Sequence, residues 1–294
     1  MGELSSPARS WRDFVEITKP RVVSLMLLTA LVGMFLSMPT MVPLAPVSLG
    51  ILGIALVAAS AAAVNHIADA QIDARMARTE HRPAAMGRVG AVEGLLFSAA
   101  LGLSGFLVLY VWVNPLTAWL NVASWVGYAL VYTLCLKRAT PQNIVLGGLF
   151  GAAPPVLGWA AITGEIATEA LLLTLIIFVW TPPHFWSLAL DRKDEYAKAN
   201  IPMLPVTHGV RATRLQVLVY TLALLVVSLM PFLIGMASWL YLGGAVVLGA
   251  GFLRLALLLF AGNERAPKAL FRYSVIYLAL LFLALVVDHA LTMP

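Results

Sequence analysis

Long apolar segments recur along almost the whole chain, separated mostly by short polar connections. A helix that crosses a membrane needs about 20 mostly apolar residues. Nine segments meet that requirement: 21–38, 44–64, 94–113, 116–135, 143–163, 169–188, 214–234, 237–259 and 272–291. Ser24 and Thr29 interrupt the first segment, and Pro154-Pro155 predicts a kink or break in the fifth. The pattern predicts an all-α, polytopic membrane protein with nine transmembrane helices.

Composition excludes an ordinary water-soluble protein. Of the 294 residues, 61% are hydrophobic and only 11% are charged, whereas soluble domains carry about 25% charged residues. Lipid must therefore surround most of the chain. The single cysteine, Cys135, excludes an internal disulfide and a multi-cysteine metal cluster, and its apolar neighbours predict a buried thiol. The first 20 residues are polar and charged and lack the apolar core of a signal peptide.

The basic residues lie on one side of the predicted membrane. All 19 Lys and Arg residues fall in the N-terminal segment, in the loops after the even-numbered segments, or at the segment ends beside those loops. The loops after segments one, three, five and seven contain none. The positive-inside rule then places the N-terminus in the cytoplasm and the C-terminus on the far side. This topology explains the net charge of +5 without a nucleic-acid partner.

Two connections are much longer than the others, and both fall on the predicted cytoplasmic side. The short connections predict antiparallel neighbours in one helix bundle. We therefore treat residues 1–294 as a single intramembrane domain with a cytoplasmic N-terminal segment, 1–20. The long loops, 65–93 and 189–213, contain most of the polar side chains and are the expected active-site loops.

The first long loop begins with three oxygen-bearing side chains at helical spacing. Asn65, Asp69 and Asp73 recur every four residues, so on a continuing helix they share one face. Magnesium prefers oxygen ligands and is often held by one or two carboxylates with substrate phosphates, and Arg78 and Arg82 could bind the same phosphates. The alternative is a solvated helix end whose acids pair with nearby arginines. Because Asn65 lies at the apolar end of a segment, where polar groups tend to be functional, we favour the metal site.

The second long loop begins with another acidic group, Asp191, Asp194 and Glu195, followed by Lys198. Alone, this pattern could be an ordinary ion-paired turn at the membrane surface. Its position on the same predicted face as the first loop favours two walls that converge on one diphosphate.

The first loop resembles the signature of the UbiA superfamily of intramembrane prenyltransferases. The resemblance covers about residues 15 to 285. Three further stretches are similar to the members of the family that farnesylate haem: Tyr132 to Val145, Gly147 to Trp159, and Trp180-Thr181-Pro182-Pro183-His184-Phe185-Trp186 with Tyr196 and Ile201-Pro202-Met203-Leu204-Pro205.

The resemblance implies nine helices around a central cavity in the inner (plasma) membrane, with a cytoplasmic active site. The implied reaction joins the farnesyl group of farnesyl diphosphate to a vinyl group of haem B, giving haem O and diphosphate, with Mg²⁺ as cofactor. Family logic adds haem A synthase or a terminal oxidase assembly factor as a partner.

The resemblance also implies roles for individual residues. The implied metal ligands are Asn65, Asp69 and Asp73, with a looser match at Asp191, Asp194 and Glu195. Many relatives have an Asp-Tyr pair where this chain has Glu195-Tyr196, so the ligand of the second metal stays open. The implied diphosphate-binding bases are Arg78, Arg82, Lys137, Arg138 and Lys198. We count Asn65, Asp69, Asp73, Arg78, Arg82, Asp191 and Asp194 as the catalytic set.

Haem requires its own contacts. His184 follows Pro182-Pro183 near the acidic end of segment six, and histidine is a common haem ligand, so we expect it to contact haem iron or a propionate. The alternative is a histidine that is hydrogen-bonded within the bundle.

Two other functions compete with haem farnesylation. A sister enzyme that prenylates an aromatic quinone precursor would share the first acidic loop, but the Pro-Pro-His-Phe-Trp and Pro-Met-Leu-Pro stretches would not be expected in it. A secondary transporter would use acids near the membrane midplane. Here the acids lie at one interface, and only Arg254 and Asp288 are candidates for mid-segment charges.

Overall fold

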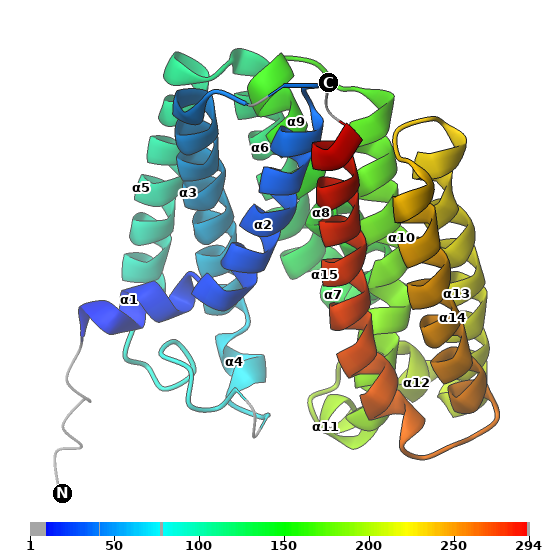
Figure 1. Ribbon diagram of the computed structural model, residues 1–294. Helices are drawn as coiled ribbons and strands as arrows, with labels where there is room; N and C mark the ends of the chain where they lie inside the picture. Colours follow the sequence, from blue (N-terminus) through cyan, green and yellow to red (C-terminus); the bar gives the residue numbers. More distant parts are fainter. Residues whose placement is uncertain (1–9, 41, 77–78, 293–294) are drawn as a thin grey trace, which may run out of the picture.

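The computed structural model describes residues 10–40, 42–76 and 79–292, and within these ranges every regular element is a helix. Figure 1 shows the long helices side by side, with the short helices α4 (Ala70–Asp73), α11 (Lys193–Lys198) and α12 (Leu204–Thr207) at one end of the bundle. The last turn of α15 lies at the opposite end. Both long loops therefore lie at the same end, as the sequence predicts.

Eight spans within the described residues are long and apolar enough to cross a membrane. They are α3 (Leu44–Ala68), α5 (Ala91–Trp112), α6 with the π-helix η1 (Pro115–Trp125 and Val126–Leu136), α8 with α9 (Asn143–Gly151 and Pro154–Thr163), α10 (Thr168–Asp191), α13 (Gly209–Leu233), α14 (Trp239–Phe260) and α15 (Ala266–Thr292). A ninth results if α1 (Trp11–Ile17) and α2 (Pro20–Leu36), bent by 49°, count as one span. The polytopic all-α prediction is confirmed.

The bends are explained by local sequence. Proline fits the first turn of a helix because its missing N–H is not needed there. Pro20 accordingly starts α2 after Lys19, whose backbone has a left-handed φ of 52°. Pro154 starts α9 in the same way, which confirms the predicted break in the fifth segment.

Helices α2 and α9 approach each other through glycine. A Cβ on Gly33 would lie 2.2 Å from the carbonyl oxygen of Pro155, and a Cβ on Gly158 would lie 2.0 Å from that of Ala30. Small residues allow such backbone contact, which is the usual way for helices to pack in lipid. Any larger residue at either glycine would push the two helices apart.

The remaining helices pack into two groups that share α10 as a border. In the first group α3 lies along α5 and α2 along α9, and in the second α10 packs against α13 and α15. The central residues of the second group, such as Tyr241, Phe252 and Tyr277, are fully buried.

Cys135 and Asp288 lie in settings that differ from those suggested by the sequence. Cys135 is exposed on the outer surface of η1, so the prediction of a buried thiol was wrong. Asp288 is buried at the far end of α15, where it accepts hydrogen bonds from the backbone N–H of Ser238 (2.7 Å) and of Tyr241 (3.1 Å). Its carboxylate thus caps the N-terminus of α14, a structural role that removes it as an ion-transport site.

Candidate active site

The first acidic motif runs from the last turn of α3 through α4. Asn65 lies in the last turn of α3, Asp69 links α3 to α4, and Asp73 ends α4. The backbone N–H of Asp69 donates to the Asn65 carbonyl (3.0 Å), and that of Asp73 donates to the Asp69 carbonyl (2.8 Å). The three side chains therefore recur one turn apart, as predicted.

These three side chains are withdrawn from solvent. Asn65, Asp69 and Asp73 have exposed fractions of 3%, 2% and 5%. A solvated helix end would leave its acids open to water, so the burial argues against that alternative. Buried carboxylates need a counter-charge, since an unpaired buried charge is very costly.

Each member of the motif has its own cationic partner. Lys137 Nζ lies 2.5 Å from Asp69 Oδ2, and Arg82 Nη1 donates to Asp73 Oδ2 at 2.8 Å. The ammonium group of Lys19 donates to Asn65 Oδ1. Lys137 and Arg82 were predicted as bases of this site. Lys19 was missed, although a lysine directly before a helix-starting proline, on the basic side of the chain, was a usable signal.

The Asn65 amide is oriented by a second hydrogen bond. Its Nδ2 donates to Thr133 Oγ1 at 3.0 Å, and the Thr133 hydroxyl donates to the Tyr128 carbonyl at 2.8 Å. Because the Thr133 proton is used in that way, its oxygen is the acceptor for Asn65. The amide oxygen of Asn65 is consequently turned toward Lys19.

The donor set suits a hard cation. Asn65, Asp69 and Asp73 offer oxygen atoms only, and Asp69 Oδ1 is buried without a hydrogen-bond partner. No group of three or more His, Cys, Asp and Glu side chains that could hold a metal occurs in the described part of the chain. Magnesium fits this arrangement because it takes few protein carboxylates and completes its shell with water and phosphate oxygens.

The second acidic motif differs in setting. Asp191 ends α10, Asp194 and Glu195 lie in the first turn of α11, and the two aspartates are less deeply buried than those of the first motif. Glu195 is half-buried and pairs with Arg192 at 3.3 Å. Within residues 10–40, 42–76 and 79–292, no hydrogen bond or ion pair joins the carboxylates of the second motif to those of the first.

The two loops nevertheless lie near each other. Met76, after the first motif, and Tyr196 and Ile201, after the second, are buried in one hydrophobic cluster. The phenol of Tyr132 on η1 lies near both Asp69 and Tyr196. The backbone thus brings the two loops to one region, while the second set of carboxylates stays accessible to solvent.

Of the three other predicted bases, Lys198 is the one whose side chain the structure describes. Lys198 is exposed at the end of α11. Arg78 lies outside the described residues, and so does the side chain of Arg138.

His184 lies in the half of α10 that is nearer the acidic loops. Its ring is buried between those of Trp180 and Phe271, and its Nδ1 lies 2.6 Å from Ser274 Oγ on α15. Haem contact by His184 stays a prediction.

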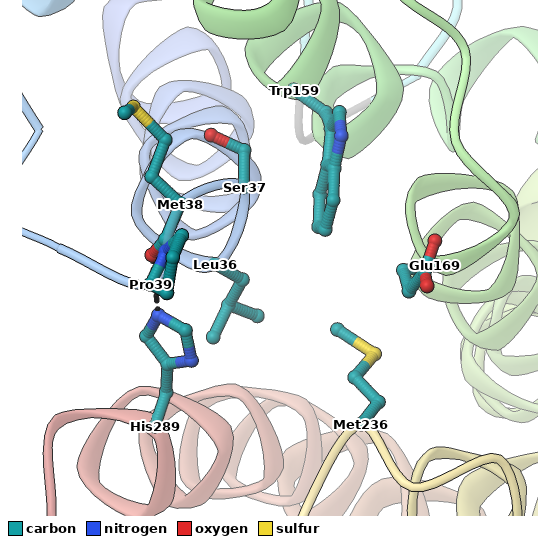
Figure 2. A pocket seen from close by; sticks show the side chains of 8 residues that line it. All are labelled: Leu36, Ser37, Met38, Pro39, Trp159, Glu169, Met236 and His289. Atoms are coloured by element: carbon teal, nitrogen blue, oxygen red, sulfur yellow. Dashed lines mark hydrogen bonds between the residues drawn. The ribbon is translucent and has the colours of Figure 1, made fainter. Parts of the chain in front are cut away.

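A separate pocket opens at the other end of the bundle (Figure 2). It has a volume of about 280 Å³ and is lined by residues that include Trp159, Glu169, Met236 and His289. His289 Nε2 bonds to the Met38 carbonyl at 2.9 Å. Its charged wall is the acid Glu169, so this pocket is unsuited to a diphosphate and is distinct from the site at the first acidic motif.

Comparison with known proteins gives relatives of nearly the same length. The pattern of the UbiA prenyltransferase family matches residues 26–286. A protoheme IX farnesyltransferase of Saccharophagus degradans is 58% identical over 96% of this chain and 93% of its own length. The Hahella chejuensis protein of the same name is 57% identical over 97% of this chain and 96% of its own length.

Solved structures share the fold at low identity. A structure described as digeranylgeranylglyceryl phosphate synthase has a TM-score of 0.80 and 17% identity, covering 95% of this chain and 98% of that one. A UbiA homolog from Archaeoglobus fulgidus bound to GPP and Mg²⁺ has a TM-score of 0.67 and 15% identity, covering 93% of this chain and 99% of that one. With the family pattern matched over most of its length and relatives more than half identical, the chain belongs to the UbiA prenyltransferase family.

Proposed function

We propose that the protein transfers the farnesyl group of farnesyl diphosphate to a vinyl group of haem B, which gives haem O and diphosphate. The observation that carries the proposal is the buried row of Asn65, Asp69 and Asp73, each with a cationic partner. The name protoheme IX farnesyltransferase, shared by relatives 57–58% identical over nearly the full chain, supports haem as the acceptor.

The reaction is a substitution at C1 of the farnesyl chain followed by addition of water. The bond between C1 of the farnesyl chain and its diphosphate oxygen breaks, and the electron pair leaves with the diphosphate. The terminal vinyl carbon of haem B forms the new carbon–carbon bond. Water adds its oxygen to the other vinyl carbon, and one proton is released.

The residues of the first motif would hold Mg²⁺, which neutralises charge on the leaving diphosphate when bound. Lys137, Arg82 and Lys19 lie around the same oxygen atoms and would bind the phosphates, together with Arg78, Arg138 and Lys198 from the surrounding loops. Asp191, Asp194 and Glu195 would complete the site from the second loop. Fixed cations in a water-poor site stabilise developing charge without reorganisation.

The segregation of all 19 Lys and Arg residues supports an orientation with this site on the cytoplasmic side of the inner membrane. Residues 1–294 would act as one domain. Haem A synthase or a terminal oxidase assembly factor would receive the product, and co-purification from native membranes would test that partner.

The test is to incubate membranes that contain the protein with haem B, farnesyl diphosphate and Mg²⁺, and to analyse extracted haems by chromatography and mass spectrometry. We expect a haem with a hydroxyethylfarnesyl group, absent without Mg²⁺ and in Asp69→Ala. Glu165→Ala, an exposed acid at the opposite end, is the matched control and should keep full activity. Unchanged haem B, with folded protein that prenylates an aromatic quinone precursor, would assign the chain to the sister enzymes instead.

A further inference from the structure

The imidazole of His184 is held rigidly between α10 and α15. It stacks on Trp180 with ring centroids 4.2 Å apart and on Phe271 at 4.7 Å, and Phe185 meets its edge at 4.9 Å. The indole N–H of Trp180 donates to the Ser274 carbonyl at 2.8 Å, which ties the stack to α15. A side chain fixed on both faces can present a ring nitrogen in only one direction.

The hydrogen bonds of Ser274 determine which nitrogen carries the proton. The Ser274 hydroxyl donates to the Phe271 carbonyl at 2.7 Å. A hydroxyl has one proton, so in the 2.6 Å contact with His184 Nδ1 the serine oxygen must accept. Nδ1 therefore carries the hydrogen, and Nε2 keeps its lone pair. The described residues supply no hydrogen-bond partner for Nε2.

A neutral imidazole with one nitrogen held by a hydrogen bond and the other free is the arrangement of a metal-binding histidine. The bonded N–H fixes the ring and raises the basicity of the ligating nitrogen. A free metal ion would need several protein ligands, and the described residues contain no such cluster. Haem iron needs only one or two, because the porphyrin supplies the other four.

We propose that His184 Nε2 binds the iron of the acceptor haem and that Ser274 is the positioning residue that sets its tautomer. This inference rests on the proposed function and specifies how the acceptor is held. The aromatic neighbours Trp180, Phe185 and Phe271 suit a flat apolar macrocycle.

The place of His184 on α10 fits that role. It precedes Asp191 by seven residues, which corresponds to about 10 Å along a helix axis. Iron bound at His184 leaves the acidic loops free for diphosphate, while the edge of the macrocycle can extend toward them. The same helix would thus set the distance between the acceptor and the leaving group.

The test uses the full-length protein purified in detergent and titrated with ferric haem B alone. The wild type should show the absorption and paramagnetic-resonance spectrum of histidine-ligated haem. His184→Ala should lose that spectrum, and added imidazole should restore it. Ser274→Ala should keep the spectrum but bind haem about 10- to 100-fold more weakly, as expected for loss of a hydrogen bond behind a metal ligand.

His208→Ala, at an exposed histidine near the same end, is the matched control and should behave as wild type. If folded His184→Ala retains the wild-type spectrum and affinity, the axial role is wrong even when haem O is still formed. If the wild type binds haem without a histidine signature, the inference fails in the same way. Failure to farnesylate haem while prenylating a quinone precursor would instead overturn the proposed function.

Discussion

The two acidic motifs are similar in sequence and different in setting. Each comes after an apolar helix and precedes basic residues, yet Asp69 and Asp73 are buried and ion-paired while Asp191 and Asp194 are accessible to solvent. Burying carboxylates carries a desolvation cost that only well-placed cations offset. The first motif is therefore held in place by contacts within the protein, whereas Asp191 and Asp194 of the second motif are left open to solvent.

The difference also suggests that the two motifs bind their ligands in different ways. Asp69 and Asp73 would hold Mg²⁺, and Lys137 and Arg82, which now neutralise them, would then be available to phosphate oxygens. The accessible acids of the second motif can exchange ligands with water at low cost. Substitutions in each motif should therefore differ sharply in their effects.

The largest effect is expected when a buried cation is removed. Lys137→Met leaves Asp69 buried without its partner, and such an uncompensated charge costs about 3 kcal/mol or more. Thermal unfolding in detergent should show a clear destabilisation, and haem O formation should be lost. Lys198→Met, at an exposed lysine of the other loop, should unfold as wild type does. Equal stability of the two variants would show that the buried pair does not hold the first motif together.

Replacing one aspartate by asparagine in each motif compares how much each motif contributes to kcat. Asp69→Asn should lower kcat at least about 100-fold, the size typical of losing one group that stabilises developing charge. Asp194→Asn should cost less than about 10-fold, because solvent-accessible charges are screened by water. Initial rates of haem O formation at saturating Mg²⁺ give both values. A larger loss in Asp194→Asn would mean that the second loop closes over the substrate and contributes more to kcat than the first motif does.

The hydroxyl behind Asn65 offers a milder test. Thr133→Val removes the acceptor that orients the Asn65 amide, so the Mg²⁺ concentration for half-maximal activity should rise by about 10-fold. Thr221→Val is the matched control, since that buried hydroxyl donates a hydrogen bond to the Val217 carbonyl of its own helix, away from the acidic motifs. Identical Mg²⁺ dependence in the two variants would show that the hydrogen bond from Asn65 to Thr133 does not influence Mg²⁺ binding.

The smallest effect is expected in the second motif. Arg192→Gln breaks the ion pair with Glu195, which is partly solvated at both ends. Exposed pairs contribute at most about 1 kcal/mol, and those one turn apart on a helix less. A shift in unfolding temperature close to that of Lys137→Met would contradict the contrast between the motifs.

The spans and the first motif could be predicted because their signals are local. About twenty apolar residues specify a spanning helix, and a four-residue repeat places Asn65, Asp69 and Asp73 on one face. The sequence could not predict which basic residue contacts which member of the first motif. Lys19 lies 46 residues from Asn65 in sequence, and Lys137 lies 68 residues from Asp69. Such contacts depend on how the helices pack, which the pattern of apolar residues does not specify.

The sequence also could not predict which side chains of the spanning helices are exposed and which are buried in the bundle. A helix in lipid is apolar on every side, so hydrophobicity does not distinguish the face toward the bundle from the face toward lipid. Cys135 illustrates this, because its apolar neighbour Leu134 is exposed as well. The break at Pro154 was predictable, since proline acts through the backbone alone.

The π-helix η1 makes the active site sensitive to the exact number of residues before Lys137. Its bonds reach five residues back, as in the Lys137 N–H that donates to the Tyr132 carbonyl. Deletion of a single residue, with the winding of the rest of the helix unchanged, would rotate the residues after the deletion by roughly 100° relative to those before it. Lys137 would then face away from Asp69, although no charged side chain had been changed. In this family member, the number of residues in η1 is thus as important for the ion pair between Lys137 and Asp69 as the identity of the lysine.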